Sequence, residues 1–174
     1  MMNYVLAIIA IVLPALIVAL TAYFTIKSSH EKELKKQVLD LKFNSKQVIT
    51  PIRLQAYERL AMFMERMKPE SLLLRNPAGN LNAGQYRTIL LSSIRSEFEH
   101  NLSQQVYVSG ALWEATKKSK EELAKIINLA VGKIGVDAAG TDLASQILDT
   151  YLQINVPPSD VALELLRQEI KELY

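Results

Sequence analysis

One uncharged apolar stretch near the N-terminus limits what this chain can fold into. No residue from Asn3 to Ile26 carries a charge, and most positions are aliphatic. A helix on a water-soluble core has a polar face, and Tyr4–Ile26 has none. At about 1.5 Å per residue, a helix from Tyr4 to Tyr23 would be roughly as long as a bilayer's hydrocarbon core is thick. The sequence therefore predicts one transmembrane anchor over residues 1–26.

A cleaved signal peptide is the alternative interpretation of this stretch. Signal peptides place a Lys or Arg before an apolar run of about 7–15 residues. This chain has no basic residue before Tyr4, and its apolar run is longer. We therefore favour a retained anchor over cleavage near Ala19–Thr21.

Basic residues just after the stretch predict its orientation. Lys27, Lys32, Lys35 and Lys36 follow within ten residues, whereas only the amino terminus precedes the stretch. By the positive-inside rule, the N-terminus faces outward and the rest of the chain is cytoplasmic. The same four lysines suit anionic lipid headgroups.

A small-residue face within the stretch is a candidate contact with another membrane subunit. Ala15 and Ala19 lie one turn apart, and Pro14 just before them could kink the helix. A purely lipid-facing helix is the alternative, because such spacing is common by chance.

Composition narrows what the rest of the chain can be. About 148 residues remain, enough for one domain with a core, and six Gly and six Pro favour helix. The absence of cysteine excludes disulfides, thiolate metal sites and Cys nucleophiles. The net charge is only +2, and the basic run Lys117–Lys120 has no accompanying glycine-aromatic motif, so we expect no nucleic-acid partner.

A charged juxtamembrane helix is expected over residues 27–50. It begins at a capping box, Ser28 to Glu31, or continues directly from the anchor. Its apolar residues follow a near-heptad spacing, which indicates packing on its own domain or a short parallel coiled coil between copies. These residues are Leu34, Val38, Leu41, Val48 and Ile52.

Residues 51–174 are predicted to form a cytoplasmic helical domain, so the fold class is all-α: one transmembrane helix followed by a bundle of about five to six helices. Proline and glycine clusters place loops near 75–83 and 135–140. Thr50, Ser109, Thr141 and Ser159 are the expected N-caps, and a break near Lys118 is an alternative. The expected helices cover 52–67, 84–104, 111–134, 142–153 and 159–174.

Helical periodicity predicts which side chains face the core. In the first two helices they are Ala56, Leu60, Phe63, Met64, Met67, Tyr86, Ile89, Leu90, Ile94, Phe98 and Leu102. In the later helices they are Leu112, Trp113, Leu123, Ile126, Ile127, Ala130, Val161, Leu165, Leu166 and Ile170 or Leu173.

The densest polar segment on an otherwise apolar helix surrounds Glu97 and His100. Glu-x-x-His is the spacing of di-iron bundles, but those need a second such motif, and His30 has no Glu three residues before it. A mononuclear metal site of Glu97, His100 and Glu58 is a weak alternative. We therefore predict no catalytic, cofactor or metal site, and interpret the segment as part of a structural, buried polar cluster. Its members are Arg53, Glu58, Arg59, Glu97, His100 and Asn101.

Three segments carry a family resemblance. Thr21–Phe24 (TAYF), Arg53–Leu60 (RLQAYERL) and Glu97–Ser109 (EFEHNLSQQVYVS) resemble a family of single-span membrane proteins from Bacteroidota. The likeness extends over nearly the whole chain. It implies a bacterial inner-membrane protein with a helical domain of unknown function, and it carries over no functional residue.

These features predict a non-enzymatic accessory or scaffold subunit of a bacterial inner-membrane complex, single-pass, with its N-terminus periplasmic and no cofactor. Its partners would be other membrane proteins or further copies of itself. One alternative is a membrane-bound enzyme or metal-binding protein centred on Glu97 and His100. The other is a membrane-surface organiser, in which the 28–50 helix self-associates and its lysines bind anionic lipid.

Overall fold

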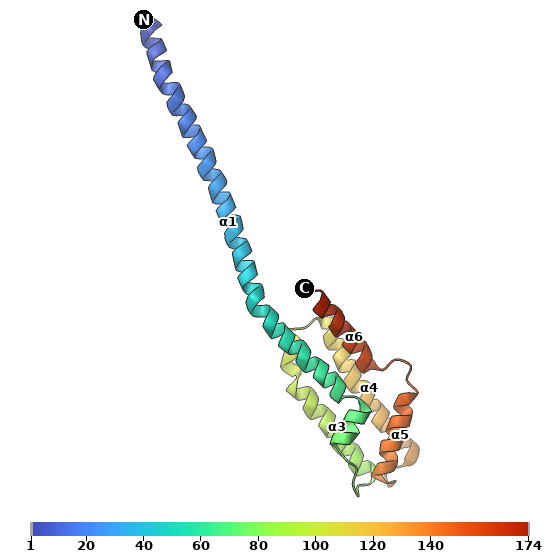
Figure 1. The fold of residues 1–174 in the computed structure, drawn as a ribbon. Coiled ribbons are helices and arrows are strands. Elements are labelled where there is room, and N and C mark those ends of the chain that lie inside the picture. The colour runs from blue at the N-terminus through green and yellow to red at the C-terminus, as the bar shows by residue number, and fades with distance from the viewer. Residues whose placement is uncertain (1, 174) are drawn as a thin grey trace. The chain divides into compact units, whose positions relative to one another are not determined.

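The structure is a computed structural model that describes residues 2–173 (Figure 1). Side chains are described throughout 47–173 and, before that, at positions 16, 20, 21, 23–27, 32, 33, 35–37, 39–41, 43 and 44. Within residues 2–173 every regular element is helical, and the only β-type pairing is one isolated bridge, between Asn82 and Ala139. The all-α prediction is confirmed.

The described chain contains six α-helices and one 3₁₀ helix. After the first helix come a helix of two turns and four longer ones, which fits the predicted helical bundle. In order they are α1 (Met2–Arg66), α2 (Pro69–Arg75), α3 (Ala83–His100), η1 (Leu102–Val106), α4 (Gly110–Ile134), α5 (Gly140–Leu152) and α6 (Pro158–Lys171).

Internal contacts divide the chain into two compact units, residues 1–49 and residues 50–174. Neither predicted division, after residue 26 or after residue 50, coincides with a helix end, because α1 is helical throughout Met2–Arg66. The predicted N-cap at Thr50 is therefore wrong. A proline inside a helix removes its own amide hydrogen bond and its ring crowds the carbonyl four residues earlier. Burial of the side chains that follow Pro51 favours the helix against that local cost.

Most side chains of the predicted transmembrane anchor, residues 1–26, lie outside the described set. Those of residues 1–15, 17–19 and 22 are not described, and Pro14, Ala15 and Ala19 are among them. Among the residues that are described, no helix is long and apolar enough to cross a membrane.

The last four turns of α1 supply a large part of the core of the 50–174 unit. All five predicted inward residues of this segment, Ala56, Leu60, Phe63, Met64 and Met67, are at most 2% exposed. Their three- and four-residue spacing places them on one helical face, as predicted. Tyr57, beside them, is also fully buried.

Helix α4 is central to the unit, since it packs against α3, α5 and α6. Its six predicted core residues, Leu112 to Ala130, are all buried, and no break occurs near Lys118. On α3, Tyr86, Leu90 and Ile94 are buried, whereas Ile89, and Leu102 in η1, are exposed, contrary to the prediction.

The inward face of α6 agrees with the prediction in part. Leu166 is buried, and Leu165, Ile170 and Leu173 are half-buried against the core, as predicted. Val161 is instead 44% exposed, and Ala162 and Leu163 are buried. Periodicity alone does not select between two adjacent apolar stripes of one helix.

Of the four expected helix caps, Ser109 is confirmed, and Thr141 and Ser159 are wrong, as Thr50 is. Ser109 caps α4, because its hydroxyl accepts a hydrogen bond from the Leu112 amide at 3.1 Å. Helices α5 and α6 begin earlier than predicted, with Ala139 and Pro157 at their N-caps, so Thr141 and Ser159 lie inside the first turn. The expected helices also omitted α2, which begins at Pro69, just after the predicted end of the first helix at residue 67.

Backbone pairing between two loops explains where α3 and α5 begin. The amides of Ala83 and Gly140 donate to the carbonyls of Ala138 and Leu81, both at 2.8 Å. A Cβ on Gly140 would lie 2.9 Å from the Leu81 oxygen and 3.1 Å from the Ala78 Cβ. Glycine is therefore required here by the close approach of the two loops.

We expect Gly140→Ala to lower the free energy of unfolding by about 1–3 kcal/mol, because the added methyl group would push the paired loops apart. Gly132→Ala is the matched control. Gly132 lies in α4, nothing is within 4 Å of an added Cβ, and alanine should stabilise the helix by about 0.5–1 kcal/mol. Urea unfolding of the full-length protein, followed by circular dichroism, measures both. Equal stability of the two variants would contradict the close-approach argument.

Candidate functional site

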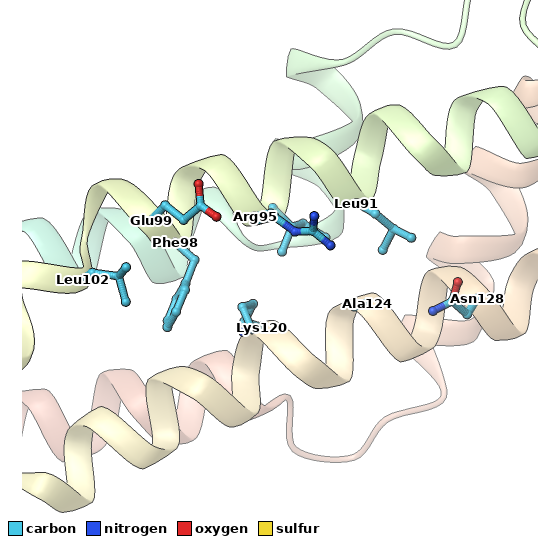
Figure 2. Close-up of a pocket in the computed structure, with 9 residues that line it drawn as sticks. Leu91, Arg95, Phe98, Glu99, Leu102, Lys120, Ala124 and Asn128 are labelled. Atoms are coloured by element: carbon cyan, nitrogen blue, oxygen red, sulfur yellow. The ribbon is translucent and has the colours of Figure 1, made fainter.

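An apolar groove of about 510 Å³ lies between α3 and α4 (Figure 2). In Figure 2, Leu91 and Phe98 of α3 and Leu102 of η1 point toward α4. Phe98 lies near Lys120, and Arg87 bonds Asn128, so the two helices run antiparallel. The apolar floor consists of Leu91, Ile94, Phe98, Leu102 and Ala124.

Charged side chains surround this floor. Arg95 and Glu99 come from α3 and Lys120 from α4, and none of the three has an ion-pair partner among the described residues. The Lys120 ammonium instead lies 4.3 Å from the centroid of the Phe98 ring, a cation–π contact. The groove therefore combines an apolar floor with three charges, two positive and one negative, that are unpaired within the described part of the chain.

Phe98 connects the groove floor to the core. Its ring centroid lies 5.5 Å from that of Trp113, with the planes 25° apart, and 6.0 Å from that of Phe63. These contacts fix the ring from α4 and α1 together. The floor is thus a preformed part of the packed unit.

A second groove, of about 700 Å³, lies between α4 and α6 and has an acidic rim. Two of its three glutamates are already paired: Glu114 with Lys117 at 2.5 Å and Glu122 with Lys125 at 3.4 Å. Its charge is therefore largely compensated, which makes the α3–α4 groove the stronger candidate.

The structure does not assemble the predicted buried polar cluster. Glu58, Arg59 and His100 are exposed, whereas Asn101 is buried and Arg53 is half-buried. His100 makes a 2.8 Å contact through Nδ1 with the Ser96 carbonyl, one turn back on its own helix. The cluster prediction was wrong for these exposed residues, because a polar run on one helix need not face the core.

Glu97 is the member of that cluster with a clear structural role. Its carboxylate lies 3.1 Å from Arg66 Nη2 and 3.4 Å from Arg75 Nη1, and Arg75 Nη2 donates to the Arg66 carbonyl at 2.7 Å. The side-chain amide of Asn101 donates to the Glu97 carbonyl at 2.8 Å. Glu97 thus ties α3 to the end of α1 and to α2. Among the residues described, no three His, Cys, Asp or Glu side chains are placed to hold a metal ion.

Glu169 organises a polar network that sequence reasoning missed. Its carboxylate accepts hydrogen bonds from the Tyr57 hydroxyl at 3.0 Å, from the Ser109 amide at 3.3 Å and from the Ser109 hydroxyl. Arg53 donates to the Tyr57 oxygen at 2.6 Å and to the Tyr107 carbonyl at 3.1 Å. The network connects α1, the start of α4 and α6. Glu169 and Ser109 are 60 residues apart, so no local pattern would have revealed it.

The network changes the acidity of Tyr57. Burial raises the pKa of the Tyr57 phenol above its usual 10.0, the hydrogen bond to Glu169 and that residue's negative charge add to the rise, and Arg53 lowers it. Burial also raises the pKa of Tyr86 and of Tyr151. All three phenols thus favour the protonated form in the folded state.

Several predicted contact residues on α1 are exposed. Lys27, Lys32, Lys35 and Lys36, the predicted lipid-binding lysines, all have exposed side chains. Large apolar side chains follow them and are 40–67% exposed: Leu39, Leu41, Phe43, Val48, Ile49 and Ile52. Leu34 and Val38 of the same predicted stripe lie outside the described side chains.

Fold and surface together define an all-α protein with a packed helical unit and a preformed apolar groove between α3 and α4. A family model matches residues 3–173, and the chain belongs to that family, DUF7935, a family of unknown function. Comparison with curated proteins found no match, and comparison with solved structures found none either.

The raised tyrosine pKa values predict a loss of stability in alkali. The pKa values of the three phenols are higher in the folded state than in the unfolded chain. Their contribution to the free energy of unfolding is therefore complete below about pH 10 and declines as the pH rises through the folded-state pKa values. Tyr57→Phe should cost about 1 kcal/mol near neutral pH and make the alkaline decline shallower. Urea unfolding from about pH 7 to pH 11 measures both. An unchanged alkaline slope would show that Tyr57 titrates as it does in the unfolded chain.

Proposed function

We propose that this protein is a membrane-anchored, non-enzymatic scaffold or accessory subunit of a bacterial inner-membrane complex. Its uncharged N-terminal stretch would anchor it, and its helical unit would bind partner proteins from the cytoplasmic side. Membership in a family of unknown function leaves this proposal to rest on the residues themselves.

The observation that carries the proposal is that the uncharged N-terminal stretch and part of the core of the 50–174 unit belong to the same helix. Helix α1 includes the uncharged stretch Tyr4–Ile26 and, in its last turns, buried core residues of the 50–174 unit. A cleavable or loosely tethered leader would not need such continuity. An anchor that is part of a domain's own core helix suits a subunit that holds other proteins at a membrane.

The polar side chains first considered for chemistry support a structural role. Glu97 binds two arginines and His100 contacts a carbonyl of its own helix, so the two side chains do not pair with each other. The groove that remains is apolar and open, which suits binding rather than reaction.

Single cysteines introduced into this cysteine-free chain test the anchor and its direction. A membrane-impermeant maleimide should label Asn3→Cys in intact spheroplasts, and should label Asp149→Cys, exposed on α5, only after lysis. The protein should also stay in the membrane fraction after a carbonate wash. Release by carbonate would contradict the anchor, and the reverse labelling pattern would contradict its orientation.

Crosslinking in native membranes, followed by mild detergent extraction, tests the scaffold role. The full-length protein should be recovered in a defined complex with another membrane protein or with further copies of itself. A strictly monomeric protein with no crosslinked partner would overturn the proposal.

Self-association at the membrane surface is a second candidate, favoured by the exposed apolar side chains of α1. At 100° per residue, Leu41, Val48 and Ile52 share one face, and they are 67%, 66% and 40% exposed. A parallel coiled coil would bury this face against the same face of a second copy, with the four lysines nearby on anionic lipid.

Cysteine crosslinking distinguishes this candidate. Parallel pairing brings identical positions together, so Val48→Cys should form disulfide-linked dimers under mild oxidation. Leu39→Cys, equally exposed but on the opposite face, is the matched control and should not. Equal dimer yields at both positions would indicate random collision and exclude a specific coiled coil.

A further inference from the structure

We propose that the α3–α4 groove binds a single amphipathic helix of a partner protein, with apolar side chains on its floor and carboxylates against Arg95 and Lys120. The inference rests on the scaffold function proposed above and specifies the chemistry of the partner segment. Three properties of the groove lead to it: its length, its openness to solvent and its charge.

The length of the groove matches a helical segment. Leu91 of α3 and Leu102 of η1 line its two ends, and the part of α3 from Leu91 to His100 alone spans roughly 14 Å, or about two and a half turns (Figure 2). A helix laid along an antiparallel helix pair places residues i, i+4 and i+7 on such a floor. The volume of about 510 Å³ accommodates several large side chains from one face.

The floor is accessible from solvent and is not a closed cavity. Leu102 at one end is 40% exposed, while Ile94 deeper in the floor is 3% exposed. Phe98 stacks on Trp113, so the floor exists before any partner arrives. Preformed apolar surface binds a rigid helix at a low cost in conformational entropy.

The charges favour an acidic partner. Arg95 and Lys120 flank the floor without a carboxylate partner among residues 47–173, and Arg87 nearby donates to the neutral amide of Asn128 at 2.6 Å. Glu99 is the one acidic residue that lines the groove. Two carboxylates beside the apolar stripe of the partner helix would therefore be attracted to the centre of the groove. A cation of the partner helix at the Leu102 end would pair with Glu99, and this contact would set the direction of the helix.

Designed peptides test this charge preference directly. The probe is a stapled 14-residue helix with leucines at positions 4, 8 and 11 and glutamates beside them, and its counterpart carries lysines in place of the glutamates. Binding to the full-length protein in nanodiscs is measured by fluorescence anisotropy. We expect the acidic probe to bind at least about tenfold more tightly than the basic one.

Charge reversal in the groove should invert the preference. Arg95→Glu with Lys120→Glu should weaken the acidic probe at least about tenfold and strengthen the basic one. Lys118→Glu with Lys133→Glu, the same charge change at two exposed positions of α4 that do not line this groove, is the matched control and should change neither. Leu102→Glu should weaken both probes by removing apolar contact. Circular dichroism verifies that each variant is folded.

Two results would overturn the inference. One is equal binding of acidic and basic probes. The other is displacement of the acidic probe by monoacyl phosphatidylglycerol together with no effect of the double reversal, which would indicate a lipid occupant.

Crosslinking of the same variants separates this inference from the scaffold function. If the wild-type protein is recovered with a partner and the double-reversal variant loses it, both proposals stand. If both proteins recover the partner equally, the groove inference fails and the scaffold function survives. If the wild-type protein recovers no partner, the scaffold function fails.

Discussion

The arrangement of α1, α4 and α6 depends on one interaction, the hydrogen bond from the buried Tyr57 hydroxyl to Glu169. A buried polar group that lacks a partner costs about 1–3 kcal/mol, so the Tyr57 phenol must meet an acceptor inside the unit. Glu169 of α6 supplies that acceptor and also receives the amide and hydroxyl of Ser109, the residue that caps α4. One carboxylate thus fixes the end of α1, the start of α4 and α6 together. Glu97 does the same at another point, where it joins α3 to α1 and α2 through two arginines.

This packing also determines which surface remains available. Helix α4 uses three sides against α3, α5 and α6, and Phe98 of α3 stacks on its Trp113. The aromatic stack belongs to the core, yet it forms part of the floor of the open groove. Arg95 and Lys120 remain beside it without ion-pair partners among the described residues, and Glu99 is the one carboxylate that lines the same groove. A rigid apolar floor with uncompensated charge is the property that distinguishes this surface from the α4–α6 groove.

Local patterns predicted the helices and most of their inward faces. Ser109 as a cap, the face of α1 from Ala56 to Met67 and the core face of α4 were all recovered from spacing alone. The failures have a common cause. Thr141 and Ser159 were expected to cap helices, but pairing of the two loops sets the start of α5 and a proline pair sets that of α6. The exposure of Val161 on α6 and of Glu58, Arg59 and His100 also depended on neighbouring helices that a one-helix pattern does not describe.

The amino-acid sequence by itself determined the all-helical class, the absence of cysteine chemistry and the uncharged stretch that motivates a membrane anchor. Hydrophobic periodicity and charge are properties of a few turns of one helix, so the sequence shows them directly. Only the tertiary structure decided that Glu169, 112 residues from Tyr57, is its acceptor, and that Arg95, Lys120 and Phe98 surround one groove. Such contacts depend on where helices end and how closely they approach, as at Gly140. These are properties of the packed unit, and no single segment of the chain encodes them.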